Sequence, residues 1–355
     1  MTTMVDVVIA KKKPYYAELE AGKTYYWCAC GRSRMQPFCD GSHKGTEFRP
    51  LAYKAESQGE EVLFCGCKHS GTKPFCDGAH NNLSDTYEED DPHSAQNRAI
   101  PTVGADGGGK ALLDGGCYVS TIKPSSLARH GAVGYRTIIG PADGALYQSL
   151  FYFECDRGRS PIIGFGDRHV ILFVSAGAGE VNIGGRVFAV GANTGAYVRP
   201  SEAFELRNAS ESPLKVFAAA CPSAESVTWH ETMPGRFDEA HPRRAIGIDP
   251  DARNRMGDRF FQMLVDKSLG STVVTQFIGE IPKSKAAPHR HLYEESLIIM
   301  SGQGAMWTES RKAPVNAGDV IFLPRKQLHS LECTHPKGML VAGVIYPGDN
   351  PSINY

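Results

Sequence analysis

Six of the ten cysteines fall into two segments that superimpose with an offset of 37 residues. Each segment carries three cysteines and one histidine in the same positions. The candidate ligands are Cys28, Cys30, Cys39 and His43 in the first segment, and Cys65, Cys67, Cys76 and His80 in the second. An Asp-Gly pair after the last cysteine of each segment provides the tight turn that brings the histidine close. Three thiolates and one imidazole suit either a tetrahedral zinc ion or an iron–sulfur cluster.

Both segments match the pattern C-x-C-x2-S/T-x3-P-x-C-D-G-S/A/T-H, and on these residues the chain resembles the CDGSH iron–sulfur proteins, the NEET family. The resemblance covers about residues 11–82. It implies one [2Fe-2S] cluster per segment, bound by the three cysteines and the histidine, and two halves that pack as a pseudo-dimer within one chain. A cluster with one histidine ligand should have a potential between roughly −400 mV, typical of all-thiolate ferredoxins, and the about −150 to +300 mV of Rieske clusters. Such clusters can accept electrons from common reductases.

A second group of candidate ligands lies near the C-terminal end of the sequence. His289 and His291 are two residues apart, Glu295 follows four residues later, and His329 comes five residues after Pro324. Residues two apart in a β-strand project to one face, so His289 and His291 can enter a barrel together, and His329 can join them from a later strand. Three imidazoles and a carboxylate suit Fe(II), Mn(II), Ni(II), Cu(II) or Zn(II), with open positions for water, substrate or O2.

The sequence around these residues resembles the two motifs of the cupin family. Residues 279–302 contain H-x-H, a glutamate four positions on and then x6-G, and residues 318–329 contain G-x5-P followed by a histidine. The resemblance favours Glu295 over Glu294 as the carboxylate ligand. It implies one mononuclear divalent metal, iron first, with manganese or zinc as alternatives. The preceding β unit lacks the H-x-H pair, so we expect a metal-free cupin half there.

Short strands separated by Gly, Pro, Asn and Asp dominate the sequence from about residue 111, and helical periodicity is almost absent. This pattern is typical of β-sandwiches and β-barrels. The predicted fold is therefore mostly β: a small tandem CDGSH domain followed by a double cupin of two β-barrel or jelly-roll units. The predicted limits are residues 1–82 for the CDGSH domain, 83–110 for an acidic and glycine-rich linker, 111–222 for the metal-free cupin and 223–355 for the metal-binding cupin. The acidic run of the linker comprises Asp85, Glu88, Glu89, Asp90 and Asp91.

Composition limits the classes of function that remain. The chain of 355 residues is 41% hydrophobic and carries 38 basic against 39 acidic side chains, which argues against a disordered or nucleic-acid-wrapping protein. No basic stripe with interleaved aromatic residues occurs, so nucleic acid is not an expected partner. There is neither a run of eighteen apolar residues nor the apolar core of a secretion signal, so we expect no membrane span and a cytoplasmic location.

Clusters that carry electrons and a mononuclear metal in one chain favour an O2-dependent oxygenase or oxidase. The expected substrate is a small polar metabolite, and an external ferredoxin or flavin reductase would supply electrons to the CDGSH clusters and, through them, to the cupin metal. Two alternatives remain open: a redox-neutral manganese or zinc enzyme (aminohydrolase, lyase or isomerase) with regulatory clusters, for which the layout resembles ureidoglycine aminohydrolases, and a redox or iron sensor. A homodimer through cupin sheet faces is expected from the resemblance alone. No catalytic residue is assigned, but several side chains are candidates for the metal pocket: Gln276, Tyr293, Trp307, Arg325 and Cys333.

Overall fold

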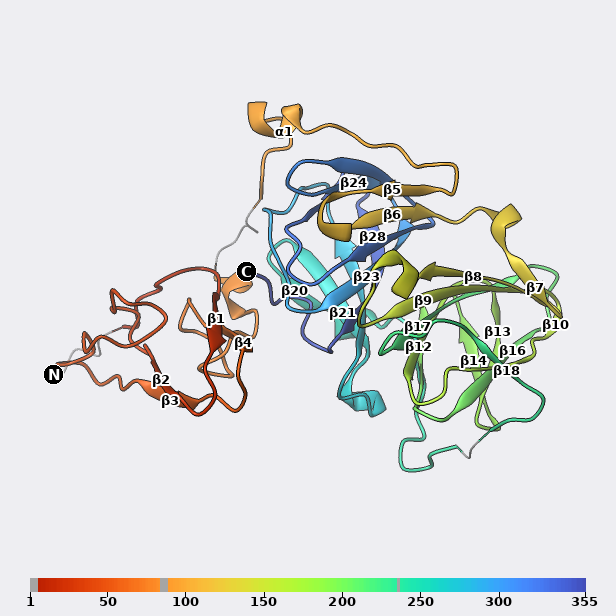
Figure 1. The fold of residues 1–355 in the computed structure, drawn as a ribbon, viewed down its shortest axis with the longest axis horizontal. Helices are drawn as coiled ribbons and strands as arrows, with labels where there is room; N and C mark the ends of the chain where they lie inside the picture. Colours follow the sequence, from red (N-terminus) through yellow and green to blue (C-terminus); the bar gives the residue numbers. More distant parts are fainter. Residues whose placement is uncertain (1–5, 84–88, 235–236) are drawn as a thin grey trace.

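A computed structural model describes residues 6–83, 89–234 and 237–355 of the chain. The fold of these residues is almost entirely β, with one short α-helix, α1 (Ala95–Ala99), and a few 3-10 turns. Figure 1 shows a small N-terminal domain beside two adjoining β units. Asp85 and Glu88 of the predicted acidic run lie outside the described residues.

The N-terminal domain is built from two intertwined halves. Its strands are β1 (Tyr15–Leu19), β2 (Thr24–Trp27), β3 (Leu51–Lys54) and β4 (Glu60–Phe64). By the 37-residue offset β1 corresponds to β3 and β2 to β4, yet β1 pairs with β4 and β2 pairs with β3. Each two-stranded sheet therefore takes one strand from each half. Trp27 and Phe64, which occupy equivalent positions, are fully buried in the shared core.

The first β unit is a sandwich of two antiparallel sheets. Its larger sheet contains β7 (Ala128–His130), β8 (Val133–Ile139), β9 (Ser149–Cys155), β12 (His169–Ala176), β15 (Thr194–Val198), β17 (Leu214–Cys221) and β19 (Ala245–Ile246), in the order β19-β15-β12-β17-β9-β8-β7. Its smaller sheet contains β10 (Gly158–Arg159), β11 (Ile162–Gly164), β13 (Ala178–Ile183), β14 (Arg186–Gly191), β16 (Ala203–Asn208) and β18 (Thr228–His230). Apolar side chains of both sheets, such as Phe153 and Phe204, fill the space between them.

The second β unit has the same two-sheet plan and contains the predicted metal ligands. Its larger sheet contains β5 (Lys110–Leu112), β6 (Tyr118–Thr121), β20 (Asn254–Met256), β21 (Arg259–Val265), β22 (Thr275–Ile281), β23 (Glu294–Ser301), β26 (Asp319–Leu323) and β28 (Met339–Tyr346), in the order β20-β21-β22-β28-β23-β26-β6-β5. Its smaller sheet contains β24 (Gln303–Trp307), β25 (Lys312–Asn316) and β27 (Ser330–Cys333). Leu297, Ile321 and Val341 belong to its interior core.

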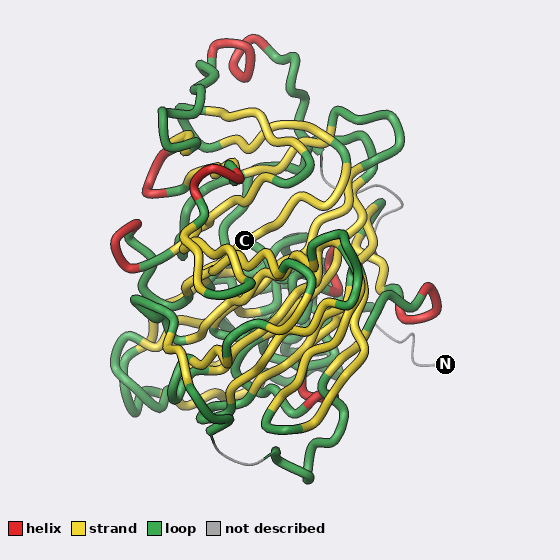
Figure 2. Tube along the Cα trace, turned by 90° about the vertical axis from the view of Figure 1, so that its right-hand side faces the viewer, coloured by secondary structure: helices red, strands yellow, loops and turns green. Residues whose placement is uncertain are grey.

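The two β units pack against each other through their large sheets. A third core joins residues from both, including Ile171 and Phe217 of the first unit and Ile298 and Val344 of the second. In Figure 2 the strands of both units form the body of the molecule, and most of the short helices lie at its edge. The pair of units is therefore one continuous β body.

Strand pairing crosses the domain limits predicted from the sequence. β5 begins at residue 110 and β6 lies beyond it, but both belong to the sheet of the second unit, because β5 pairs with β6 and β6 pairs with β26. Conversely, β18 and β19 follow residue 222 but pair with β11 and β15 of the first unit. The domain limits remain predictions, and in each unit some strands come from the other side of a predicted limit. The described part of the linker also packs on the second unit, since Asp90 forms an ion pair with Lys285 at 2.6 Å and Thr102 bridges to Lys312.

Candidate functional site

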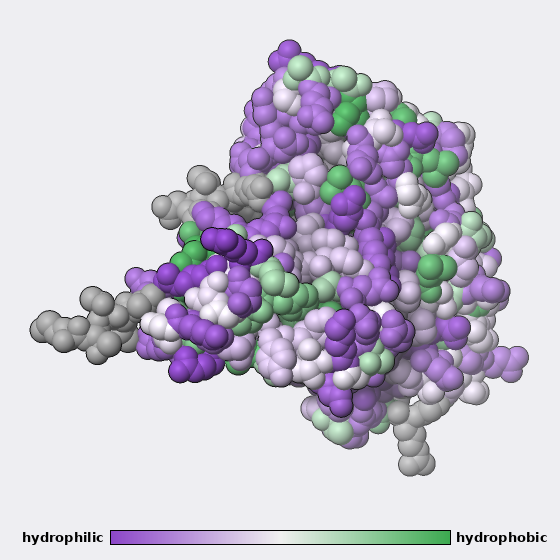
Figure 3. Space-filling view, turned by 60° about the vertical axis from the view of Figure 1, so that its left-hand side comes forward, coloured by the Kyte–Doolittle hydropathy of each residue, from purple (hydrophilic) through white to green (hydrophobic). Residues whose placement is uncertain are grey.

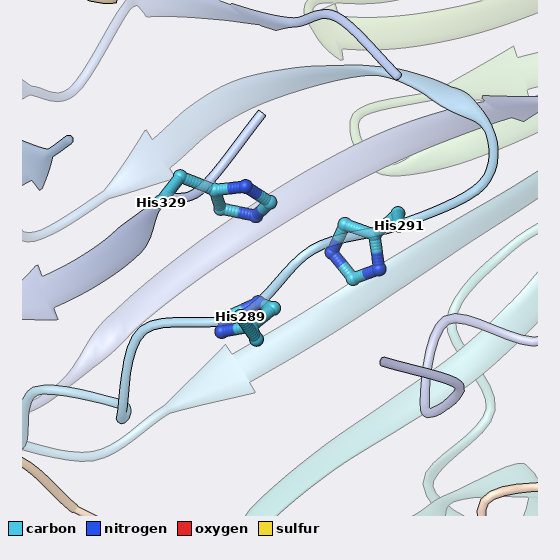
Figure 4. Close-up of side chains that lie close together, drawn as sticks. All are labelled: His289, His291 and His329. Carbon is cyan, nitrogen blue, oxygen red and sulfur yellow. The ribbon is translucent and has the colours of Figure 1, made fainter. Parts of the chain in front are cut away.

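Three histidines from two chain segments meet inside the second β unit. His289 and His291 lie in the extended segment before β23, and His329 lies just before β27. Backbone hydrogen bonds in both directions join His289 to His329, with N–O distances of 3.0 and 3.1 Å. One ligand nitrogen from each ring lies within 4.8 Å of the others, and Figure 4 shows the rings around a common space. The spacing of the histidines predicts that they lie within strands, but all three lie just before a strand.

Each ring is oriented by a backbone carbonyl. Nδ1 of His289 lies 2.9 Å from the carbonyl of Ala287, and Nδ1 of His329 lies 2.8 Å from that of Gln327. Nδ1 of His291 lies 3.2 Å from the carbonyl of Ile353. A carbonyl only accepts, so each Nδ1 carries the proton and each Nε2 offers a lone pair, as in metal-binding histidines. This donor set fits a divalent metal.

The electrostatic surroundings keep the three imidazoles neutral. Burial lowers the pKa of His289 and His291 well below the usual histidine value, and it lowers the pKa of His329 to about 4. Burial also raises the pKa of Glu295 to about 8. Neutral imidazoles can coordinate a metal ion, and the positive charge of that ion would allow the buried carboxyl to ionise. These surroundings therefore favour metal binding.

The two neighbouring glutamates have different surroundings. The carboxylate of Glu295 lies 3.6 Å from Nε2 of His291 and lines the cavity of the three histidines. Glu294 points the other way and accepts backbone N–H groups of residues 146, 147 and 148 in the first β unit. Glu295 would therefore serve as the fourth ligand, while Glu294 ties the two units together.

A cavity of about 90 Å³ borders the histidines. Its walls are largely apolar and come from Phe261, Phe277, Leu297, Met306, Leu331 and Val341. The lining also includes Arg259, Phe260 and Glu280, and residues 351 and 354 of the C-terminal segment. The side chains suggested by sequence as pocket candidates, Gln276, Tyr293, Trp307, Arg325 and Cys333, are not among the lining residues of this cavity. Of these, Tyr293 stacks its ring on that of His291, with 4.5 Å between the ring centroids.

In the N-terminal domain the predicted cluster ligands lie in pairs. Sγ atoms of Cys28 and Cys30 are 3.7 Å apart, and those of Cys65 and Cys67 are 3.5 Å apart. The remaining cysteine of each half lies 3.2 or 3.4 Å from Nδ1 of its histidine, His43 or His80. Within the described residues, the cluster ligands do not form a group of three within 4.8 Å, as the three cupin histidines do. Two close pairs per half fit a two-iron cluster, in which each iron takes one pair, better than a single tetrahedral zinc ion.

Lys68 is a buried cation between the two cluster sites that the sequence reasoning did not single out. Its side chain is 1% exposed, and Nζ donates to Oε1 of Gln36 in the other half and to the carbonyl of Cys65. A hydrogen bond from the neighbouring Cys67 thiol, backbone N–H groups and Lys68 lower the pKa of Cys65 against the opposing effect of burial. Lys68 thus adds positive charge where thiolates gather.

The second cluster site faces the β body, whereas the first faces solvent. His80 is 5% exposed, and Cys76 is buried in a small cluster with Leu63 and Ile353. His43 and Cys39 are only half-buried. Figure 1 places the C-terminus between the N-terminal domain and the second β unit. The C-terminal segment, residues 351–355, therefore lies at the junction between the second cluster site and the cupin.

Further contacts hold this junction. Asn81 donates to the carbonyl of Ser352 at 2.7 Å, and Tyr16 stacks on Tyr355 with ring centroids 5.5 Å apart. Glu61 of the N-terminal domain accepts from Arg325 at 2.7 Å and also pairs with Lys326. Arg325 and Lys326, which lie between Pro324 and His329 of the second cupin motif, thus contact the N-terminal domain.

Comparison with known proteins agrees with these two parts. Residues 4–44 and 49–81 match the family described as iron-binding zinc finger CDGSH type, and residues 278–346 match the cupin domain. The mouse and human proteins named CDGSH iron-sulfur domain-containing protein 3, mitochondrial, are each 59% identical over 51 residues. That match covers 14% of this chain and 37% or 40% of those relatives, so it spans less than half of their length.

Solved structures resemble the β body. Protein Ylba from E. coli matches with a TM-score of 0.51 at 15% identity, covering 72% of this chain and 98% of that one. Procruciferin from Brassica napus has a TM-score of 0.54 at 10% identity, covering 65% and 86%. Lactobacillus farciminis oxalate decarboxylase, in a formate complex, has a TM-score of 0.51 at 11% identity, and the match covers 65% of this chain and 87% of that one. At these identities the likeness shows the fold alone. The chain thus carries two CDGSH-type segments within residues 4–81 and a cupin domain at residues 278–346, and its two β units share the fold of double-cupin structures. No helix among its described residues is long and apolar enough to cross a membrane.

Proposed function

We propose that this protein is a metal-dependent oxidoreductase in which the CDGSH domain delivers electrons to a mononuclear centre in the C-terminal cupin, which oxidises a small molecule with O2. The cupin metal would be held by His289, His291, Glu295 and His329. The clusters would be held by the cysteine and histidine pairs of each CDGSH half. When bound, these groups supply one-electron transfer and an open coordination position for substrate or O2.

One observation carries the proposal: Ile353 contacts both sites. Its side chain packs in the buried cluster that contains Cys76, a predicted ligand of the second cluster. Its carbonyl accepts from Nδ1 of His291, a predicted ligand of the cupin metal. A single residue thus separates the two sets of ligands. Electron delivery requires such a short separation, whereas regulation of the cupin by the clusters does not require it.

The surroundings of the two CDGSH halves support a direction for this delivery. The first half, with half-buried Cys39 and His43, is the side that an external reductase can reach. Exposed Arg32, Arg34 and Lys44 lie near these ligands in sequence, and Figure 3 shows a mainly hydrophilic surface on the N-terminal domain. The second half faces the cupin. Electrons would therefore enter at the first half and leave from the second.

Metal analysis of anaerobically purified, fully loaded protein tests the proposal first. Two [2Fe-2S] clusters account for four irons, so five irons per chain is the expected result. Four irons with one manganese or zinc would contradict it and would favour redox-neutral chemistry under cluster control.

A kinetic experiment tests the link between the sites. The clusters are reduced anaerobically and mixed with O2, and their reoxidation is followed by visible absorbance. We expect reoxidation to slow at least tenfold in the double variant His289→Ala, His329→Ala, which keeps the cluster ligands. The control variant His335→Ala changes a histidine outside the metal cavity and should behave like the unaltered protein. Equal rates in all three proteins would refute electron delivery to the cupin.

A further inference from the structure

Arg259 places a cation in the wall of the metal cavity. It is the first residue of β21, its side chain is 7% exposed, and it lines the same cavity as the three histidines and Glu295. The guanidinium keeps protein partners there, because Nη2 donates to Oγ of Ser284 at 3.5 Å and Nε lies 4.0 Å from Oδ1 of Asp258. Arg259 is thus a charged group in the largely apolar wall of the cavity.

Burial alternates along β21 at Arg259, although Phe260 also lines the cavity. Arg259 and Phe261 are both buried, while Phe260 between them is half-buried. The ring of Phe260 lies under the guanidinium of Arg253, 4.2 Å from its centroid, and Arg253 pairs with Glu280 at 2.6 Å. Glu280, although it borders the cavity, thus has its carboxylate turned to a half-exposed partner. Arg259 is buried in the cavity wall, whereas Arg253 is exposed and is not among the lining residues.

The remaining walls differ sharply from Arg259 in chemistry. Apart from the metal ligands, most of the lining comes from aromatic and aliphatic side chains on β21, β22, β23, β24, β27 and β28. An apolar group gains free energy on these walls in proportion to the area it buries. A guanidinium presents a planar fork of N–H donors that matches a carboxylate with two parallel hydrogen bonds.

We infer that the cavity binds a carboxylate with an apolar body, and that Arg259 is the residue that anchors the carboxylate. This inference rests on the proposed function, because it takes the metal cavity as the active site, and it narrows the substrate from a small polar metabolite to an apolar carboxylic acid. An amine of the same size is disfavoured, since it would place a second cation beside Arg259. The apolar body then lies along the walls of Phe261, Phe277 and Leu297.

Calorimetric titration of the fully loaded protein under anaerobic conditions tests the assignment. The probes are hexanoate, acetate, 1-hexanol and hexylamine, and the variants are Arg259→Met, Arg259→Lys and the exposed control Arg253→Met. We expect hexanoate to bind at least tenfold tighter than acetate, hexanol or hexylamine. Arg259→Met should weaken hexanoate at least tenfold and leave hexanol unchanged, Arg259→Lys should lie between, and Arg253→Met should match the unaltered protein.

Three results would overturn the inference. Unchanged hexanoate affinity in both Arg259 variants would mean that Arg259 does not bind the carboxylate. Equal affinity for acetate and hexanoate would show that the cavity does not recognise an apolar body. Equal affinity for hexylamine and hexanoate would show that it does not select an anionic group. Near-ultraviolet circular dichroism and the cluster absorbance verify that each variant is folded, and Arg259→Lys keeps the buried charge if Arg259→Met is unstable. Binding is measured without electron flow. The carboxylate inference can therefore fail while the proposed electron delivery is confirmed, and electron delivery can fail while the carboxylate inference is confirmed.

Discussion

Nδ1 of His291 donates to the backbone carbonyl of Ile353, 3.2 Å away, and so ties a predicted metal ligand to a segment that also covers the second cluster site. Hydrogen bonds of this kind fix the tautomer and the orientation of a metal-binding ring, and their loss typically lowers metal affinity 10–100-fold. The C-terminal segment therefore has a role in both sites.

Removal of residues 351–355 tests that role. Because the carbonyl acceptor of His291 is lost, we expect cupin-metal affinity to fall roughly 10–100-fold in competition with a chelator. The matched control is Tyr355→Ala, which removes the stacking on Tyr16 but keeps Ile353. If the truncated protein holds the cupin metal as tightly as the control, the carbonyl does not support His291.

The different exposure of the two cluster sites predicts two rates of iron release. Cys39 and His43 are half-buried, whereas Cys76 and His80 are buried against the C-terminal segment. A water-soluble iron chelator should therefore remove iron in a fast and a slow phase. Cys39→Ser should abolish the fast phase and Cys76→Ser the slow one, as measured by the loss of visible absorbance. A single phase in the unaltered protein would contradict the asymmetry.

Much of this architecture follows from local sequence pattern. The apolar run Leu297–Met300 lies inside β23 and the run Val320–Leu323 lies inside β26, because a strand between two packed layers needs continuous apolar residues. The 37-residue repeat likewise implied two equivalent halves. The spacing of His289 and His291 was sufficient to place them together because neighbouring residues cannot separate far.

Other features depend on contacts between distant residues and could not be derived in this way. Arg325 was a candidate for the metal pocket, but its guanidinium reaches Glu61 of the CDGSH domain. Gln276 faces Gly195 of the first β unit instead of the cavity. The pairing of β6 with β26 joins residues about 200 positions apart, and no local pattern encodes it. The position of Arg259 in the cavity wall could not be predicted, because a single arginine in a strand belongs to no motif.

A buried ion pair in the first β unit predicts a dependence of stability on pH. Arg244 is fully buried and forms two hydrogen bonds with Glu202, at 2.6 and 2.8 Å. Burial alone would raise the pKa of Glu202, but hydrogen bonds from Arg244 and from backbone N–H groups prevail and lower it. The stabilisation from a lowered carboxyl pKa is present above the unfolded value and is lost as pH falls through the folded value.

Glu202→Gln should therefore lower the free energy of unfolding by about 3 kcal/mol at neutral pH, since it leaves a buried guanidinium without its charged partner. The difference from the unaltered protein should shrink as pH falls below about 4.5, the ordinary value for glutamate. Urea unfolding followed by tryptophan fluorescence measures it. Glu211→Gln is the control, because Glu211 pairs with Arg157 on the exposed surface and such pairs contribute little. An equal effect of both substitutions would show that burial does not govern the pair.

Glu61 holds the CDGSH domain against the cupin, so its loss should separate the two sites without destroying either. It accepts from Tyr16 within its own domain and from Arg325 across the junction, and it pairs with Lys326. We expect Glu61→Gln to increase hydrogen exchange in residues 351–355 several-fold and to slow cluster reoxidation by O2, with the content of cluster and cupin metal unchanged. Glu60→Gln is the matched control, because the neighbouring Glu60 accepts from Tyr53 inside the CDGSH domain. If Glu61→Gln loosens the junction but leaves reoxidation at its original rate, the contact at Ile353 is not the route by which electrons reach the cupin.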